Sequence, residues 1–116
     1  MASPSAESRL YELHAELCKT LSSPVRLRVL NLLRDGEKTV SELVAATGLR
    51  QANLSQHLAV LRQRGIVAVR KEGVNAYYGV ANRKMIRACD TIREVLLEQL
   101  SEAEELAKRA SRGEQR

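Results

Sequence analysis

The sequence predicts a single, mainly helical domain in which a helix-turn-helix is followed by a two-stranded β-hairpin and a long final helix. The length of 116 residues suits one domain with one modest core. Apolar residues recur at helical spacing along most of the chain, and one β-branched stretch near residue 67 interrupts that spacing. Only three residues are aromatic, all of them tyrosines, so we expect a core of Leu, Val, Ile and Ala.

Two helices are expected before the helix-turn-helix. Leucines recur at steps of three and four residues from Leu10 to Leu21, which is the period of a helix. Pro24 then begins a second helix, because proline is tolerated in the first turn, and Gly36 ends it. The residues that we expect this second helix to turn inward are Leu27, Leu30 and Leu33.

A capping box marks the start of the helix-turn-helix. The hydroxyl of Thr39 can accept from the backbone amide of Glu42, whose carboxylate can accept from the amide of Thr39. The helix that begins near Val40 is short because Gly48 follows it, and another amphipathic helix comes after this turn. A helix, a turn containing glycine and a second helix form the helix-turn-helix pattern. The expected buried row of the second helix is Leu54, Leu58 and Leu61.

The remainder of the folded region is predicted as a hairpin and one long helix. Residues 66–70 and 76–80 have strand-like composition and flank a turn at residues 72–75. A two-stranded hairpin is marginally stable alone, so it must lean on the helices. The final helix, of about 25 residues, is predicted from an apolar stripe at helical spacing: Met85, Cys89, Ile92, Leu96, Leu100, Ala103 and Leu106.

The composition bounds the location and the chemistry of the protein. We expect residues 8–110 to form the folded domain, with flexible ends at residues 1–7 and 111–116. No apolar run approaches the roughly 20 residues of a membrane helix, and the start lacks the order of a secretory signal. A cytoplasmic protein without a membrane partner is therefore expected. Cys18 and Cys89 stand 71 positions apart, so we expect reduced thiols rather than a disulfide scaffold or a zinc finger.

The sequence offers no arrangement for catalysis. It contains no Gly-x-Ser-x-Gly elbow and no Gly-rich phosphate loop. The two histidines, His14 and His57, lie on different predicted helices. We therefore expect no enzyme activity and no cofactor.

Charge is segregated along the chain, although its total is only +5. Residues 50–75, which span the second helix of the helix-turn-helix and the hairpin, contain five basic residues and one acidic residue. Residues 85–108, in the final helix, contain six acidic and three basic residues. One basic and one acidic region are typical of a protein that meets DNA phosphates with one face. A merely solvated surface would explain the total charge but not this segregation.

The chain resembles the ArsR/SmtB family of small bacterial repressors. The stretches that carry the resemblance are LSSPVRLRVL at residues 21–30, LSQHLAVLR at residues 54–62 and GVNAYYGV at residues 73–80. The resemblance implies a winged helix-turn-helix protein that binds a double-stranded DNA operator as a homodimer and represses transcription. The first and last helices would build the dimer, and the expected contacts are Leu10, Leu13, Leu17, Ile92, Leu96 and Leu100. A final helix packed wholly within its own monomer is the alternative.

By this resemblance, residues 51–64 form the recognition helix in the major groove and the hairpin forms the wing. Gln and Asn in the first turns can pair bidentately with adenine, and the wing would contact the backbone or a minor groove. The candidate DNA-binding residues are Arg50, Gln51, Asn53, Ser55, Gln56, His57, Arg62, Arg70, Lys71 and Asn75. The alternatives are a structural, hydrogen-bonding role for His57 and a solvated tip for the hairpin.

The known metal and persulfide sites of the family are not matched. Where the arsenic- and cadmium-responsive pattern has two cysteines, this chain has Thr39 and Ser41. Asn31 and Leu97 stand where persulfide-responsive relatives have their cysteines. The positions of the zinc-type ligands hold residues of which only the last can bind a metal: Asn82, Lys84, Val95 and Glu98. We therefore expect no metal at the standard sites.

Cys18 on the first helix and Cys89 on the last remain as thiol-sensor candidates for redox or sulfur species, because these helices touch in the family architecture. One alternative is that Cys89 is a small buried hydrophobe. Another is a site for a thiophilic metal or metalloid formed by His14, Cys18 and Cys89, since His14 and Cys18 are four residues apart. A DNA-binding protein that senses nothing and a protein-interaction module are the alternative functions. The sequence identifies neither the operator nor an inducer.

Overall fold

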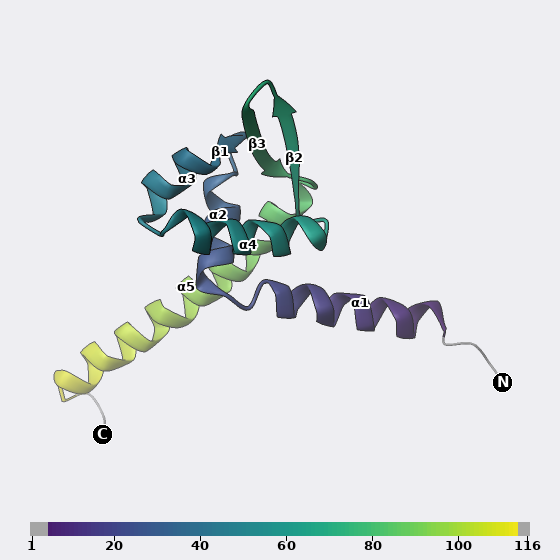
Figure 1. Ribbon diagram of the computed structural model, residues 1–116. Helices are drawn as coiled ribbons and strands as arrows, with labels where there is room; N and C mark the ends of the chain where they lie inside the picture. The colour runs from purple at the N-terminus through teal and green to yellow at the C-terminus, as the bar shows by residue number, and fades with distance from the viewer. Residues whose placement is uncertain (1–4, 114–116) are drawn as a thin grey trace. The chain divides into compact units, whose positions relative to one another are not determined.

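The computed structural model describes residues 5–113 of the chain (Figure 1). It forms two units, the first ending at Arg83 and the second beginning at Lys84. The first unit contains α1 (Ala6–Thr20), α2 (Pro24–Leu32), β1 (Lys38–Thr39), α3 (Val40–Thr47), α4 (Gln51–Gln63), β2 (Val67–Glu72) and β3 (Asn75–Val80), and the second contains α5 (Lys84–Ser111). The predicted order of helices and hairpin is confirmed. No helix among the described residues is long and apolar enough to span a membrane.

Helices α1 and α5 lie at the two ends of the described residues. Helix α1 begins at Ala6, two residues before the expected boundary, and the hydroxyl of Ser5 caps it by accepting from the amide of Ser8 at 3.0 Å. Helix α5 ends at Ser111, one residue after the expected boundary. Residues 1–4 and 114–116 of the predicted flexible ends lie outside the described residues.

The core of the first unit joins α2, α3, α4 and the start of the hairpin. The fully or almost fully buried side chains are Val29, Leu30, Leu33, Leu43, Leu54, Leu58, Leu61, Ile66 and Val67. The predicted row of α4 is therefore confirmed. The inward prediction for Leu27 is wrong, because this side chain is 41% exposed while Val29 is 0% exposed. Successive helical residues are about 100° apart, so a helix that buries Val29, Leu30 and Leu33 carries Leu27 to its flank.

The sheet has three strands rather than the two that the sequence predicts. Strand β3 lies in the centre and pairs antiparallel with β2 and with the short β1, where Lys38 faces Tyr78 and Thr39 faces Tyr77. Two polar residues carry no strand periodicity, so β1 leaves no signal in the sequence. This added strand anchors the hairpin on the segment that precedes α3.

The hairpin of β2 and β3 has longer strands and a shorter loop than predicted. Its ladder runs from the pair Val67 and Val80 to the pair Glu72 and Asn75. Only two residues remain for the loop, and Gly73 in this loop has a positive φ of 61°. A two-residue loop needs such a left-handed conformation, which glycine adopts without strain.

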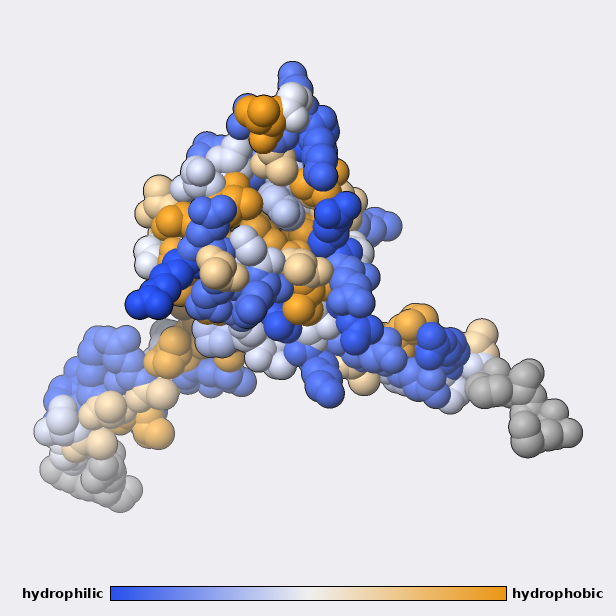
Figure 2. All heavy atoms as spheres, in the orientation of Figure 1, coloured by the Kyte–Doolittle hydropathy of each residue, from blue (hydrophilic) through white to orange (hydrophobic). Residues whose placement is uncertain are grey.

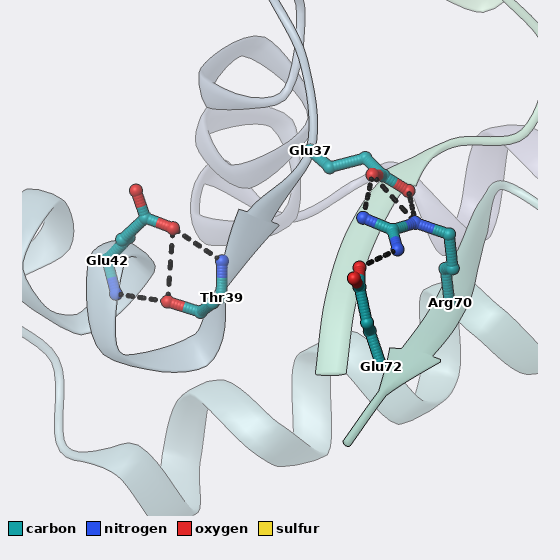
Figure 3. Close-up of polar contacts among 5 residues, drawn as sticks. All are labelled: Glu37, Thr39, Glu42, Arg70 and Glu72. Atoms are coloured by element: carbon teal, nitrogen blue, oxygen red, sulfur yellow. Dashed lines mark hydrogen bonds and ion pairs between the residues drawn. The ribbon is translucent and has the colours of Figure 1, made fainter. Parts of the chain in front are cut away.

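The predicted capping box at the start of α3 is confirmed (Figure 3). The amide of Glu42 donates to Oγ1 of Thr39 at 3.2 Å, and the amide of Thr39 donates to Oε1 of Glu42 at 2.9 Å. The backbone hydrogen bond from Thr39 is the main cause that lowers the pKa of the Glu42 carboxyl. Gly48 ends α3 with a φ of 73°, and its amide donates to the carbonyl of Val44 at 2.8 Å. The helix-turn-helix is thus fixed at both ends of α3.

Helices α1 and α5 expose most of their apolar side chains. Figure 2 shows hydrophobic residues among the hydrophilic ones on each of these helices. Helix α5 has 28 residues, yet Ile86 is its only buried one among the described residues. Five of the six predicted dimer contacts are exposed, namely Leu10, Leu13, Ile92, Leu96 and Leu100, whereas Leu17 is half-buried.

Candidate DNA interface

Helix α4 presents a polar face because its apolar face is fixed in the core. Leu54, Leu58 and Leu61 are each 0% exposed, and this row sets the rotation of the helix about its axis. Exposed polar side chains that can donate to and accept from base edges lie around the rest of the first two turns: Gln51, Asn53, Ser55 and Gln56. The structure therefore leaves four of the predicted DNA-binding residues accessible in the first two turns of α4, outside the buried row.

The N-terminus of α4 has no side-chain cap, so its first backbone amides can bind an anion. Arg50 occupies the N-cap position, but its side chain makes no capping hydrogen bond. The carbonyl of Arg50 accepts from the amide of Leu54 at 3.0 Å, which begins the helical hydrogen bonds. The first backbone amides of a helix and its dipole both favour negative charge, and the exposed Arg50 adds a full positive charge at the same end. A DNA phosphate suits this position.

His57 has a different environment from the other predicted residues of α4. It is half-buried, and its Nδ1 accepts a hydrogen bond of 3.2 Å from Nε of Arg26 on α2. The structural, hydrogen-bonding alternative for His57 is therefore present in the structure. Arg26 is 31 residues away in the sequence and was not among the candidate residues.

Arg70 lies at the surface and is paired with two carboxylates (Figure 3). Its Nη2 donates to Oε1 of Glu37 at 2.9 Å, and its Nη1 donates to Glu72 on the same strand. The guanidinium also lies 4.7 Å from the centroid of the Tyr77 ring, within range of a cation–π interaction. The hydrogen bonds with Glu37 and then Glu72 raise the pKa of Arg70. Its positive charge is thus paired with two carboxylates of the same chain.

Glu37 supports the wing, and the sequence alone gives no indication of this role. It lies 33 residues before Arg70 and has no periodic or motif signal of its own. In the structure, Gly79 on β3 faces this side chain. A Cβ at position 79 would lie 3.2 Å from Cγ of Glu37, so the glycine leaves room for the Glu37 side chain to reach Arg70.

The remaining predicted basic and polar residues are accessible. Arg62 is exposed near the end of α4, and Lys71 and Asn75 are exposed on the two strands of the wing. Val74 in the loop is 101% exposed, and Figure 2 shows a hydrophobic residue at the tip of the hairpin. These residues give the wing one accessible cation and an apolar tip.

The two cysteines lie in different units of the structure and differ in environment. Both are free thiols, with Cys18 exposed on α1 and Cys89 half-buried on α5. Partial burial raises the pKa of Cys89, the charge of Asp90 adds to this effect, and Arg93 opposes it. Residues 5–113 contain no group of three or more His, Cys, Asp or Glu side chains positioned to hold a metal ion.

Comparisons with known proteins decide the family. The model of the arsR family of bacterial regulatory proteins matches residues 23–69, from the N-cap of α2 into β2. The HTH-type transcriptional regulator Rv0081 of Mycobacterium tuberculosis is 42% identical over 94 residues, which cover 80% of this chain and 82% of that protein. The chain belongs to the arsR family of bacterial regulatory proteins. The resemblance found in the sequence is confirmed.

A further relative and two solved structures agree with this assignment. A biofilm growth-associated repressor of Agrobacterium fabrum is 42% identical and covers 77% of this chain and 75% of its own length. The crystal structure of Rv0081 superposes with a TM-score of 0.75 at 41% identity, covering 81% of this chain and 95% of that one. A second similar structure is the solution structure of the homodimeric winged helix-turn-helix DNA-binding domain of Mb0332 from Mycobacterium bovis. It superposes with a TM-score of 0.75 at 33% identity and covers 86% of this chain and 94% of that one. This arsR-family chain is therefore a winged helix-turn-helix, DNA-binding transcriptional regulator and not an enzyme.

Proposed function

We propose that this arsR-family protein is a cytoplasmic, homodimeric repressor that reads a near-palindromic operator with one α4 helix in each of two major grooves. The observation that carries the proposal is the polar face of α4, which the buried Leu54, Leu58 and Leu61 hold outward. A two-fold dimer would place its recognition helices about 34 Å apart, which is one turn of DNA.

Within α4, the first two turns are proposed to read bases. Gln51 and Asn53 are exposed, and their amide groups can each donate to and accept from one adenine. Ser55 and Gln56 are also exposed and offer further donors and acceptors. Each bidentate pair contributes about 1–3 kcal/mol of discrimination against the wrong base.

We propose phosphate contacts at both ends of α4. Arg50 with the open helix start lies at one end of the helix, and Arg62 is exposed near the other. On the wing, we propose Lys71 and Asn75 as the backbone contacts. Arg70 then positions the wing through Glu37 and Glu72 instead of touching the DNA, which revises the role expected from the sequence.

The dimer is proposed to form through α1 and α5 of two copies. Leu10 and Leu13 on α1 and Ile92, Leu96 and Leu100 on α5 are between 45% and 67% exposed in the single chain. An exposed apolar row on a helix, such as each of these two helices carries, marks a protein-interaction surface. The homodimeric state of the Mb0332 domain supports a second copy of this chain as the partner.

A thiol response is the second candidate, added to DNA binding rather than replacing it. It is supported by the exposure of Cys18 on α1, one of the two helices proposed to form the dimer. Modification of a thiol there would change how two copies pack, and with it the spacing of the recognition helices. Gel shifts of wild type, Cys18→Ser and Cys89→Ser with oxidant, persulfide or As(III) test this response, and equal DNA release by all three proteins would exclude it.

The function is tested by fluorescence anisotropy with the chain's own upstream region and with random DNA at two salt concentrations. A repressor dimer should bind both DNAs through phosphates, with affinity falling steeply as salt rises, and should bind the operator more tightly at either salt. Sedimentation of the complex should give two chains per operator. A protein that shows no salt-dependent DNA binding is an interaction module of another kind.

A further inference from the structure

Arg26 connects three helices of the first unit. It is the third residue of α2, where Pro24 begins the helix and the hydroxyl of Ser23 accepts from the amide of Arg26 at 3.3 Å. Its Nη1 donates to the carbonyl of Thr20 at the end of α1 at 3.1 Å, and its Nε donates to Nδ1 of His57 on α4 at 3.2 Å. Arg26 is half-buried, and three of its groups are hydrogen-bonded: the backbone amide, Nε and Nη1.

The hydrogen bond from Arg26 determines the protonation pattern of the His57 ring. A guanidinium can only donate, so the Nδ1 atom that faces it must carry a lone pair. With the lone pair on Nδ1, the ring proton lies on Nε2. Of the two neutral tautomers, the contact with Arg26 permits only one.

The Nε2 atom of His57 lies at the surface of the protein. The hydrogen bonds among residues 5–113 give His57 one partner, Arg26. No buried side-chain nitrogen or oxygen in that part of the chain lacks a partner, so an Nε2 atom without one must reach solvent. His57 follows the exposed Gln56 and comes one turn after Asn53 on the same helix.

We infer that Arg26 is a positioning residue that fixes the tautomer of His57, with Nδ1 facing Arg26 and an outward Nε2–H that is a dedicated donor to an acceptor atom of the DNA. The inference rests on the proposed role of α4 in DNA binding. The acceptor is a phosphate oxygen or a base atom, since both accept from an N–H group. Arg26 thus acts on the DNA through His57 and keeps its own charge inside the protein.

The tautomer is tested on the full chain without DNA by nitrogen-15 NMR of the imidazole rings at about pH 8, where histidine is neutral. His57 should show a protonated Nε2 and a lone pair on Nδ1, whereas the exposed His14 should show the averaged pattern of a free ring. Arg26→Met and Arg26→Lys both remove the Nε donor, and the second keeps the charge. Both should move His57 toward the pattern of His14.

A proton on Nδ1 of wild-type His57 would overturn the inference, as would a spectrum that neither Arg26 variant changes. The wild-type spectrum and the charge-conserving variant decide the question even if Arg26→Met does not fold. If the wild-type protein binds no DNA, the proposed function fails, but the tautomer still tests the role of Arg26.

The donor role is tested by DNA affinity. His57→Asn loses the distal donor and should bind about threefold to tenfold more weakly, which is the loss of one hydrogen bond. His57→Gln keeps an N–H near the Nε2 position and should retain most of the affinity. Arg26→Lys should weaken binding to a similar extent as His57→Asn, and combining the two should cause no further loss.

Two results of the affinity series contradict the inference: equal losses for His57→Gln and His57→Asn, and fully additive losses for the Arg26 and His57 variants. The DNA used identifies the acceptor. Equal weakening of His57→Asn on operator and random DNA indicates a phosphate, whereas a loss confined to one operator position indicates a base.

Discussion

The guanidinium of Arg70 on β2 donates from Nη2 to Oε1 of Glu37 at 2.9 Å and so ties the wing to the segment between α2 and β1. The two side chains are 50% and 42% exposed, and an ion pair at that exposure contributes little to stability. Its importance lies in the geometry of the wing. The pairing also leaves Lys71 as the cation of the wing that is open to phosphates.

Lys71 and Arg70 should therefore differ in the salt dependence of DNA binding. Each phosphate contact that is lost lowers the slope of log affinity against log salt by about 0.9. Lys71→Ala should flatten the slope by this amount, whereas Arg70→Ala should leave it unchanged. The measurement is anisotropy with random DNA over a range of salt. An equal flattening by Arg70→Ala would mean that Arg70 leaves Glu37 and contacts the backbone in the complex.

Gly79→Ala should destabilise the protein through Glu37. The added Cβ would lie 3.2 Å from Cγ of Glu37, which is a tight contact. Because the Glu37 side chain is partly exposed and can shift, we expect a loss near the lower end for overpacking, about 1 kcal/mol in the free energy of unfolding. Urea denaturation measures it. In a Glu37→Ala protein, Gly79→Ala should cost less unfolding free energy than it does in the wild type. An equal cost in both proteins would mean that the effect comes from strand β3 and not from the contact with Glu37.

The capping box should make stability depend on pH through Glu42. Its folded-state pKa is lowered, so its contribution is complete above the unfolded-state pKa and is lost as pH falls through the folded one. Glu42→Gln is the matched control, since it keeps an acceptor oxygen and does not titrate there. The difference in unfolding free energy between wild type and this variant should be constant near neutral pH and fall in acid. A difference independent of pH would contradict the lowered pKa.

Cys89 should react slowly with alkylating agents. Its pKa is raised by partial burial, so less of the reactive thiolate is present at a given pH. In a Cys18→Ser protein, iodoacetamide should modify Cys89 at about pH 8 more slowly than it modifies a peptide of residues 85–93. Denaturant should restore the rate of the peptide. If native Cys89 reacts as fast as the peptide, burial does not suppress its thiolate and the prediction is wrong.

The sequence predicts the local features of this fold well because their signals are local. Thr39 and Glu42 are three residues apart, and the capping box that they predict is present. The spacing of Leu54, Leu58 and Leu61 predicts both α4 and the face that it buries. The exposed polar residues of α4 follow directly from this spacing, because residues outside the buried row face outward.

The contacts that fix the candidate DNA-binding residues are long-range and leave no pattern. Arg26 and His57 are 31 residues apart, and Glu37 and Arg70 are 33 apart, so no helical or strand period relates them. The basic character of Arg70 predicts a DNA contact, yet folding places two carboxylates beside it. A count of charges along the chain does not show which charges are paired.

The central claim, that the polar face of α4 reads bases, is tested most directly by the affinities of Gln51→Ala and Asn53→Ala for the operator and for random DNA. Both side chains are exposed, so neither change should alter folding. Each variant should lose about 1–3 kcal/mol of binding free energy on the operator, relaxing preference at particular base pairs, and almost none on random DNA. Equal losses on both DNAs would contradict base reading by this face.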